Sequence, residues 1–185
     1  VQTCALPIYS FYPTKNLGGI GDGGAVVTDD DAFAEQIRLL RVHGNAGDYR
    51  HVARATNARL SEMEAAALRI GLRTLAEGNA RRREIAHRLH AAAPHLQWHA
   101  DHERHVYHLL VVRHADRDVW RAMLPFETGV HYARAITQQP AYADAVREAC
   151  PQAEAWAAEC VSLPCFPELT DAELDIVVEA LACSR

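Results

Sequence analysis

The stretch that decides the fold is Ser10-Phe11-Tyr12-Pro13-Thr14-Lys15-Asn16-Leu17-Gly18-Gly19-Ile20-Gly21-Asp22-Gly23-Gly24. Of the 19 Lys and Arg residues in the chain, Lys15 is the only lysine. Arginine can replace lysine wherever only a positive charge is required. It cannot do so where an amine must lose its proton and attack a carbonyl carbon. The sequence therefore predicts that Lys15 is a reactive amine.

Three features of this segment fit pyridoxal-phosphate chemistry. A Schiff base needs an amine on a fixed backbone, and the hydroxyl of Ser10 or Thr14 could hold the cofactor phosphate. Glycines let the chain turn sharply beside a bulky ligand. A phosphate-binding P-loop is disfavoured because the lysine precedes the glycines. A hairpin turn built from glycines would explain the glycines but not the single lysine.

The composition is that of a soluble globular protein, and it excludes several functional classes. Half of the 185 residues are hydrophobic (49%) and 23% are charged, which suits one domain or a piece of a larger one. No apolar run approaches the roughly 20 residues of a membrane span. The net charge is −5 and the arginines are scattered, so we predict neither membrane nor nucleic-acid binding.

Cysteines and histidines give no metal or disulfide signal. The five cysteines are odd in number and lack C-x-x-C spacing, which predicts neither a disulfide framework nor a zinc site. His102, His105 and His108 come closest to a ligand pattern. They flank a run that we interpret as a strand, which would put His105 and His108 on opposite faces. We therefore predict no metal.

The first eight residues, Val1-Gln2-Thr3-Cys4-Ala5-Leu6-Pro7-Ile8, resemble the translation of a sequencing-library adapter. They have neither the charged start nor the cleavage site of a signal peptide. We interpret residues 1–8 as an adapter-derived segment and expect the true protein to extend upstream.

Periodicity and capping signals predict alternating helices and strands. We expect strands at 25–28, 106–113 and 129–132, and helices at 32–42, 63–75, 80–93, 116–124 and 154–160, followed by a last helix. Asp29 or Asp30 would cap the first helix. Capping boxes at Ser61–Glu64 and Thr170–Glu173 would start two others. A break is expected near Gly78.

A series of motifs carries a family resemblance over residues 9–185. In chain order they are S-F-Y-P-T-K-N-L-G (10–18), G-D-G-G-A-V-V-T (21–28), R-L-L-R-V-H-G (38–44), N-A-R-L-S-E-M-E-A-A (57–66), N-A-R-R-R-E-I-A (79–86), H-V-Y-H-L (105–109), V-H-Y (130–132), Q-P-A-Y (139–142) and S-L-P-C-F-P-E-L-T (162–170). The series resembles the DegT/StrS family of sugar aminotransferases, which are pyridoxal-phosphate enzymes of fold type I. Such enzymes serve polysaccharide or antibiotic biosynthesis.

The resemblance implies an α/β fold, namely the C-terminal part of a fold-type I aminotransferase. Residues 9–78 would be the end of the large cofactor-binding domain, and residues 79–185 a connector helix with the small C-terminal domain. The two would be parts of a cytoplasmic homodimer. The substrates would be small molecules: glutamate or glutamine as amino donor, and a keto-sugar linked to a nucleotide as acceptor.

The resemblance also implies roles for individual residues. Lys15 would form the Schiff base and move the catalytic proton. Ser10 would bind the cofactor phosphate, and Asn57 the phosphate of the partner subunit's cofactor, with Arg59 fixing the Asn57 loop. His131 and Tyr132 would lie on the sugar side of the site.

Two departures from the family pattern bear on function. The family often has H-Y-P-x-P-x-H-x-Q where this chain has His131-Tyr132-Ala133-Arg134-Ala135-Ile136-Thr137-Gln138. The acid that pairs with the pyridinium nitrogen and the aromatic that stacks on the ring are expected before Ser10, and neither is present. We therefore expect this fragment alone to be inactive.

Three other functions were weighed, and two of them remain as alternatives. Related dehydratases commonly have histidine where this chain has Lys15, which argues against a dehydratase. A non-catalytic regulatory or binding protein of the same fold is one alternative, and another fold-type I enzyme such as a lyase is the other.

Overall fold

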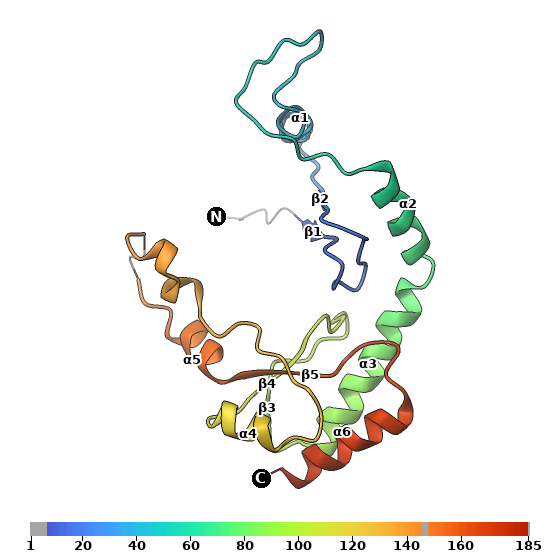
Figure 1. The fold of residues 1–185 in the computed structure, drawn as a ribbon, viewed down its shortest axis with the longest axis vertical. Coiled ribbons are helices and arrows are strands. Elements are labelled where there is room, and N and C mark those ends of the chain that lie inside the picture. Colours follow the sequence, from blue (N-terminus) through green and yellow to red (C-terminus); the bar gives the residue numbers. More distant parts are fainter. Residues whose placement is uncertain (1–6, 146–147, 185) are drawn as a thin grey trace. The chain divides into compact units, whose positions relative to one another are not determined.

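The computed structural model of the protein describes residues 7–145 and 148–184 (Figure 1). The chain divides into two compact units, the first ending at Ala76 and the second beginning at Glu77. No helix in the described ranges is long and apolar enough to cross a membrane. The assignment of residues 9–78 and 79–185 to a large and a small domain stays a prediction.

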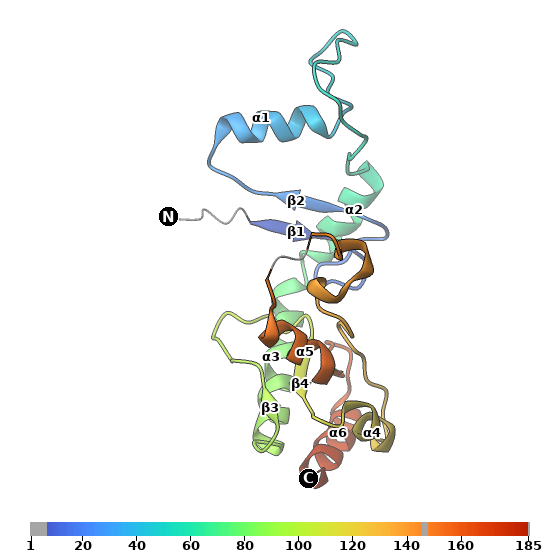
Figure 2. The same ribbon diagram turned by 90° about the vertical axis from the view of Figure 1, so that its left-hand side faces the viewer.

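The first unit contains a hairpin in which β1 (Ile8–Ser10) pairs antiparallel with β2 (Gly24–Val26), with Ser10 opposite Gly24 (Figure 2). The N–H of Val27 also donates to the carbonyl of Pro7 at 3.0 Å. Pro7 and Ile8 of the expected adapter-derived segment thus take part in the fold. Residues 1–6, the rest of that segment, lie outside the described residues, so its adapter origin stays a prediction.

Two helices complete the first unit, and both begin where capping predicted. Helix α1 (Asp31–Leu40) starts after Asp30, whose carboxylate accepts from the N–H of Phe33 at 3.1 Å. Helix α2 (Glu62–Gly71) starts after Ser61, whose hydroxyl accepts from the N–H of Glu64 at 3.1 Å. Each bond satisfies a backbone donor of the first helical turn.

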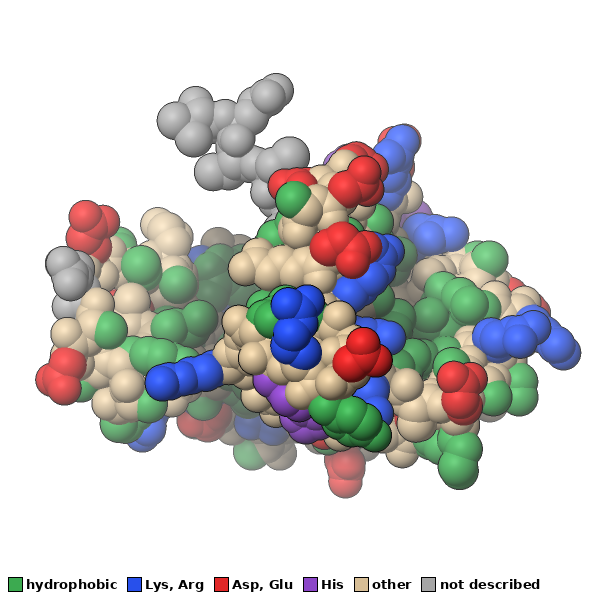
Figure 3. Space-filling model, turned by 90° about the horizontal axis from the view of Figure 1, so that it is seen from above, with side chains coloured by type: hydrophobic (Ala, Val, Ile, Leu, Met, Phe, Trp, Pro, Cys, Tyr) green, Lys and Arg blue, Asp and Glu red, His purple; other side chains and the backbone are tan. Residues whose placement is uncertain are grey.

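Few apolar side chains of the first unit are buried. Among its described large apolar side chains only Leu68 falls in the buried class, at 5% exposure. Ile8 and Ile70 are 76% and 66% exposed, although they belong to a strand and a helix. On the face of the whole chain that Figure 3 draws, hydrophobic side chains lie between charged ones. The main core of the chain lies in the second unit.

The second unit is a three-stranded antiparallel sheet with helices. The strand order is β3 (Gln97–Trp98), β4 (Leu110–Arg113), β5 (Cys160–Leu163). Helices α3 (Leu75–Ala92) and α6 (Asp171–Cys183) supply apolar residues to one core with alternate residues of the strands. The buried residues of this core include Ile85, Ala86, Leu89, Leu110, Val112, Val161, Leu163, Leu174, Val177 and Leu181. Because side chains alternate along a strand, Val111 of β4 points to the opposite face.

The connections of the second unit carry shorter elements: α4 (Arg117–Met123), α5 (Pro151–Glu159) and two 3₁₀ turns, η1 (Ile136–Gln138) and η2 (Pro140–Tyr142). The expected capping box of the last helix is confirmed. Thr170 accepts from the N–H of Glu173 at 3.3 Å, and Glu173 accepts from the N–H of Thr170 at 2.9 Å.

The break between two helices that was expected near Gly78 occurs earlier, at residues 72–74. Helix α2 ends at Gly71 and α3 begins at Leu75, so Gly78 lies inside α3. A Cβ at position 78 would lie 3.2 Å from Pro167 Cγ. The glycine therefore allows close packing against Pro167 and does not end the helix.

Two expected strands are also wrong in part. The strand expected at 106–113 begins only at Leu110, because Tyr107 has a positive φ of 41° that interrupts the extended chain. The strand expected at 129–132 is reduced to one bridge, in which Gly129 and Ser162 exchange hydrogen bonds of 2.9 and 2.8 Å. His105 and His108 therefore lie in a loop. The prediction that a strand would place them on opposite faces does not apply.

Candidate functional site

Lys15 lies in a closed loop between β1 and β2. At the base of the loop, the N–H of Phe11 donates to the carbonyl of Gly23 and the N–H of Gly19 donates to the carbonyl of Phe11, both at 2.8 Å. At its tip, the N–H of Lys15 donates to the carbonyl of Tyr12 at 2.9 Å. These bonds fix the backbone that carries the amine. We call residues 11–24 the lysine loop.

The tip of the lysine loop requires a glycine at position 18. A Cβ there would lie 2.3 Å from the carbonyl oxygen of Pro13 and 3.1 Å from that of Lys15. Real Cβ atoms do not approach a backbone oxygen to 2.3 Å, so any other residue would force the turn open. Lys15 itself is half-buried.

Ser10 ends β1 directly before the lysine loop. Its hydroxyl oxygen accepts from the N–H of Tyr12 at 3.3 Å, and the residue is exposed. The hydroxyl hydrogen is not used by that bond, so Ser10 can still donate one hydrogen bond. The structure thus places Ser10 and Lys15 at the base and the tip of one short segment.

Asn57 lies on a second loop of the first unit, which leads into α2. Its position is set by a bridge to Val42 and by the bond from the N–H of Ala58 to the carbonyl of Arg41 at 2.9 Å. Arg59 Nε donates to Asn57 Oδ1 at 2.9 Å. This bond directs the amide oxygen to Arg59 and leaves the NH₂ group as the donor for a ligand.

The donor set of the first unit fits pyridoxal phosphate. An amine on a hydrogen-bonded loop suits attachment of an aldehyde, and a hydroxyl, an amide NH₂ and a guanidinium suit an anionic phosphate. Ser10, Asn57 and Arg59 are exposed and thus accessible to a ligand.

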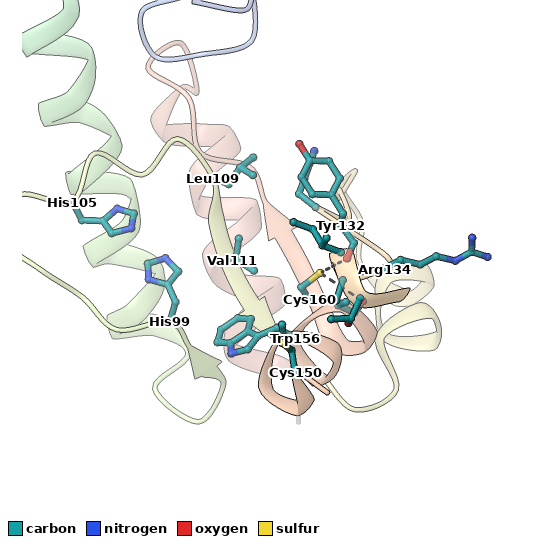
Figure 4. A pocket seen from close by; sticks show the side chains of 15 residues that line it. His99, His105, Leu109, Val111, Tyr132, Arg134, Cys150, Trp156 and Cys160 are labelled. Atoms are coloured by element: carbon teal, nitrogen blue, oxygen red, sulfur yellow. Dashed lines mark hydrogen bonds between the residues drawn. The ribbon is translucent and has the colours of Figure 1, made fainter. Parts of the chain in front are cut away.

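His131 and Tyr132 lie in the second unit, where they line a pocket of about 760 Å³. Figure 4 shows the side chains of Leu109 and Val111 along its floor and Trp156 beside them. His131 Nδ1 lies 2.8 Å from the hydroxyl of Ser162, which orients the imidazole.

The remaining lining of this pocket is partly polar. Tyr132 is 70% exposed, so its hydroxyl is accessible. Arg134 and Thr137 also line the pocket. Such a pocket can hold a ligand with an apolar face and several polar groups.

Histidines form the opposite wall of this pocket. The rings of His99 and His105 stack with centroids 4.7 Å apart, and His90 packs on Trp98 at 4.4 Å. Burial lowers the pKa of His90 and of His105, while the carboxylate of Asp101 acts in the opposite direction on both. In the part of the chain that the structure describes, no three His, Cys, Asp or Glu residues form a metal-binding group. Sequence reasoning considered His105 only as a metal ligand and missed the stacking.

The buried Glu64 was also missed as a functional candidate. The sequence indicated only a capping box at Ser61–Glu64. The structure contains half of that box, because no bond from Glu64 back to the Ser61 N–H occurs among the described residues. The carboxylate turns instead towards the lysine loop. A sequence cannot show which way such a side chain turns.

The fold of the chain is that of the C-terminal part of fold-type I aminotransferases. The crystal structure of S. venezuelae DesV in complex with a ketimine intermediate matches it with a TM-score of 0.89 and 37% identity, over 96% of this chain and 50% of that chain. An aminotransferase structure from Brucella abortus matches with a TM-score of 0.88 and 28% identity, over 95% of this chain and 50% of that one.

Residues 3–182 match the DegT/DnrJ/EryC1/StrS aminotransferase family, and the chain belongs to this family. It is 42% identical to the erythromycin biosynthesis sensory transduction protein EryC1 of Saccharopolyspora erythraea, over 94% of this chain and 50% of that protein. It is 39% identical to a pleiotropic regulatory protein of Geobacillus stearothermophilus, with the same coverage. It is 40% identical to the dTDP-3-amino-3,4,6-trideoxy-alpha-D-glucose transaminase of Streptomyces venezuelae, over 94% of this chain and 48% of that protein.

These matches confirm the family and fold class expected from the motifs. The chain spans about half the length of the curated relatives it matches. The roles of Ser10, Lys15, Asn57, His131 and Tyr132 stay predictions.

Proposed function

We propose that this chain provides the lysine-bearing part of a transaminase that transfers an amino group from glutamate or glutamine to a nucleotide-linked keto-sugar. The observation that carries the proposal is Lys15, the only lysine of the chain, at the tip of a loop closed by three backbone hydrogen bonds. The relative from Streptomyces venezuelae, whose name specifies a dTDP-linked amino sugar, supports the class of acceptor.

The cofactor, when bound, supplies an aldehyde that condenses with an amine and a ring that takes up an electron pair. Lys15 Nζ would hold the cofactor, and once the amino group of the substrate has displaced it, the free Lys15 amine would remove and return the proton at the reacting carbon of the substrate. The Ser10 hydroxyl donates to the phosphate. Asn57 donates its NH₂ group, oriented by Arg59, to the phosphate in the partner subunit of a homodimer.

The pocket of the second unit carries groups that suit a sugar. His131 is held by Ser162, and Tyr132 exposes its hydroxyl on the same pocket wall. Hydroxyl and imidazole groups suit the many hydroxyls of a sugar, and the apolar floor suits the face of its ring. We propose these two residues as contacts of the acceptor.

Because the chain spans half the length of its relatives, we propose that it is a fragment of a longer cytoplasmic protein. The acid and the aromatic that contact the cofactor ring would lie in the part outside this chain. On this proposal the 185-residue chain alone does not transaminate.

The test uses the full-length protein with Lys15→Ala and Lys15→Arg. Wild-type protein should show a cofactor absorbance band that borohydride fixes onto the peptide containing Lys15, and both variants should lose that adduct. Lys15→Arg keeps the positive charge. Loss of the adduct in this variant would therefore show that the amine, and not the charge, is required. An adduct that persists in both variants would refute the assignment.

A second candidate function is supported by the regulatory names of two relatives, from Saccharopolyspora erythraea and Geobacillus stearothermophilus. A non-catalytic regulator would bind a ligand without turnover. Incubation of full-length protein with labelled glutamate and a dTDP-linked keto-sugar separates the two, since only a transaminase yields the labelled amino sugar. Amine release without transfer would instead indicate a lyase.

A further inference from the structure

Glu64 is a buried acid that the proposed chemistry does not use. It is 5% exposed, and its Oε1 atom is buried without a hydrogen-bond partner. Burying a polar atom without a partner disfavours folding. Capping does not explain the residue, because the hydroxyl of Ser61 alone caps the Glu64 N–H. The carboxylate therefore calls for another explanation.

The side chain of Glu64 lies near three glycines of the lysine loop, two of which face its carboxylate. A Cβ added to Gly19 would lie 1.4 Å from Oε1, and one added to Gly21 would lie 3.6 Å from Oε2. A Cβ on Gly23 would lie 3.7 Å from Glu64 Cγ. Glu64 thus lies directly against Gly19, close to Gly21, and beside Leu60 at Gly23, where an added Cβ would lie 2.8 Å from Leu60 Cδ1.

The glycines that touch Glu64 also close the lysine loop. Gly19 and Gly23 are the residues whose backbones bond to Phe11 at the loop base, both at 2.8 Å. Further along α2, a Cβ on Gly71 would lie 3.3 Å from Leu17 Cδ1. Helix α2 therefore contacts the lysine loop at two places. Gly71 faces Leu17 through an apolar contact, and Glu64 faces Gly19 through a polar one.

We propose that Glu64 is a positioning residue that holds the lysine loop against α2 and so sets the position and reactivity of the Lys15 amine. The inference deepens the proposed transaminase function and rests on it for the meaning of Lys15. Because α2 follows the Asn57 loop directly, Glu64 also links the two cofactor-binding segments of the first unit.

The test measures how fast trinitrobenzenesulfonate modifies Lys15 in cofactor-free full-length protein, read by mass spectrometry of the peptide containing Lys15. Glu64→Ala removes the side chain that contacts the lysine loop. Gly19→Ala adds a methyl group on the loop, at the point where Gly19 faces the Glu64 carboxylate. Both should speed the modification by about fivefold or more, as expected when a held segment opens locally more often. Glu64→Gln keeps the shape and should restore the rate to within about twofold of wild type.

Glu62→Ala is the matched control, since Glu62 is an exposed acid in the same first turn of α2. Its modification rate should equal that of wild type. If Glu64→Ala fails to fold, as judged by circular dichroism, Gly19→Ala decides the question. A Lys15 rate in folded Glu64→Ala or Gly19→Ala that stays within about twofold of the Glu62→Ala control overturns the proposal.

A second readout separates positioning from a purely structural role. In the cofactor-loaded protein, Glu64→Ala should shift the pH midpoint of the cofactor absorbance change, whereas Glu64→Gln and Glu62→Ala should not. An unchanged midpoint in Glu64→Ala overturns the positioning role. Absence of any cofactor band in wild type would refute the proposed function, while the modification rates would still decide whether Glu64 controls Lys15.

Discussion

The imidazole rings of His99 and His105 stack face to face, 4.7 Å between centroids and 17° from parallel. Beside them, Tyr107 is fully buried and its hydroxyl donates to Asp101 Oδ1. His90 lies at the edge of the Tyr107 ring, 6.2 Å from its centroid. This cluster joins α3 to the loop before β4 and has direct consequences for stability.

Acid should destabilise the second unit through this cluster. Burial lowers the pKa of His90 and His105 in the folded chain below the ordinary value of 6.5, and the groups facing them are Asp101, His87, His99 and His102. The unfolded chain therefore binds these protons first, so stability is complete above about pH 6.5 and falls as the pH drops through the lowered values. We expect thermal melts to show a lower Tm at pH 5.5 than at pH 7.5.

Replacement of His105 by Phe should flatten this pH dependence, because the variant carries no proton at that position. His51→Gln, an exposed histidine of the first unit, is the control and should retain the wild-type slope. A slope in His105→Phe equal to that of wild type would contradict the assignment.

Arg82 should be among the most sensitive positions in the second unit. It is 9% exposed, and its guanidinium donates to the carbonyls of Tyr107, at 3.3 Å, and of Cys165. Arg82→Ala leaves both carbonyls without this donor and should lower the free energy of unfolding by about 2–4 kcal/mol. Urea unfolding measures the loss. Arg83→Ala, at the next and less buried position of α3, should cost less than about 1 kcal/mol.

The hydroxyl of Tyr107 should contribute to folding through Asp101. Burial, together with the hydrogen bond to Asp101, raises the pKa of Tyr107 above its usual range. The same bond is the main cause that lowers the pKa of Asp101. Tyr107→Phe should therefore lower stability at pH 7 by about 1–2 kcal/mol.

The loss of stability caused by Tyr107→Phe should be smaller in acid. Asp101 has a lowered pKa in the folded chain, so its contribution is complete above about pH 3.8 and is lost as the pH falls below that value. Denaturant melts at pH 7 and pH 3 measure the difference. A loss that is equal at both values would show that the phenol acts through packing alone.

The capping box of α6 should contribute measurably to the free energy of unfolding. Thr170→Ala removes both the acceptor for the Glu173 N–H and the hydroxyl that donates to the Glu173 carboxylate at 2.7 Å. We expect a loss of about 1 kcal/mol in urea unfolding, with Thr170→Ser close to wild type. Equal losses in the two variants would point to the methyl group of Thr170 rather than to the cap.

The proposed cross-subunit role of Asn57 can be tested by mixing inactive subunits. Lys15→Ala and Asn57→Ala homodimers of the full-length protein should each lose most transaminase activity. If Asn57 serves the partner's cofactor, a mixed dimer contains one site with both wild-type residues, and activity returns. Without exchange of residues between subunits, every site of the mixture stays defective and no activity returns.

Particular residues show where sequence reasoning succeeded. Asp30, Ser61 and Thr170 were expected to cap helices, and each accepts the predicted N–H, because capping depends on atoms only three residues apart. Tyr107 and Gly78 show where it failed. Gly78 packs on Pro167, which is distant in the sequence, and β4 is shortened by the positive φ of Tyr107, a conformation that bulky residues rarely adopt.

The sequence by itself determined the family and led to the prediction that Lys15 is a reactive amine, because motif order and a single lysine among arginines are properties of the chain alone. Only the tertiary structure decided that the glycines after Lys15 rest on Glu64 and that His99 and His105 stack on one pocket wall. These contacts join residues at least six and up to 45 positions apart in the sequence. The direction in which such side chains turn is settled by the competition for space and for hydrogen bonds in the folded chain.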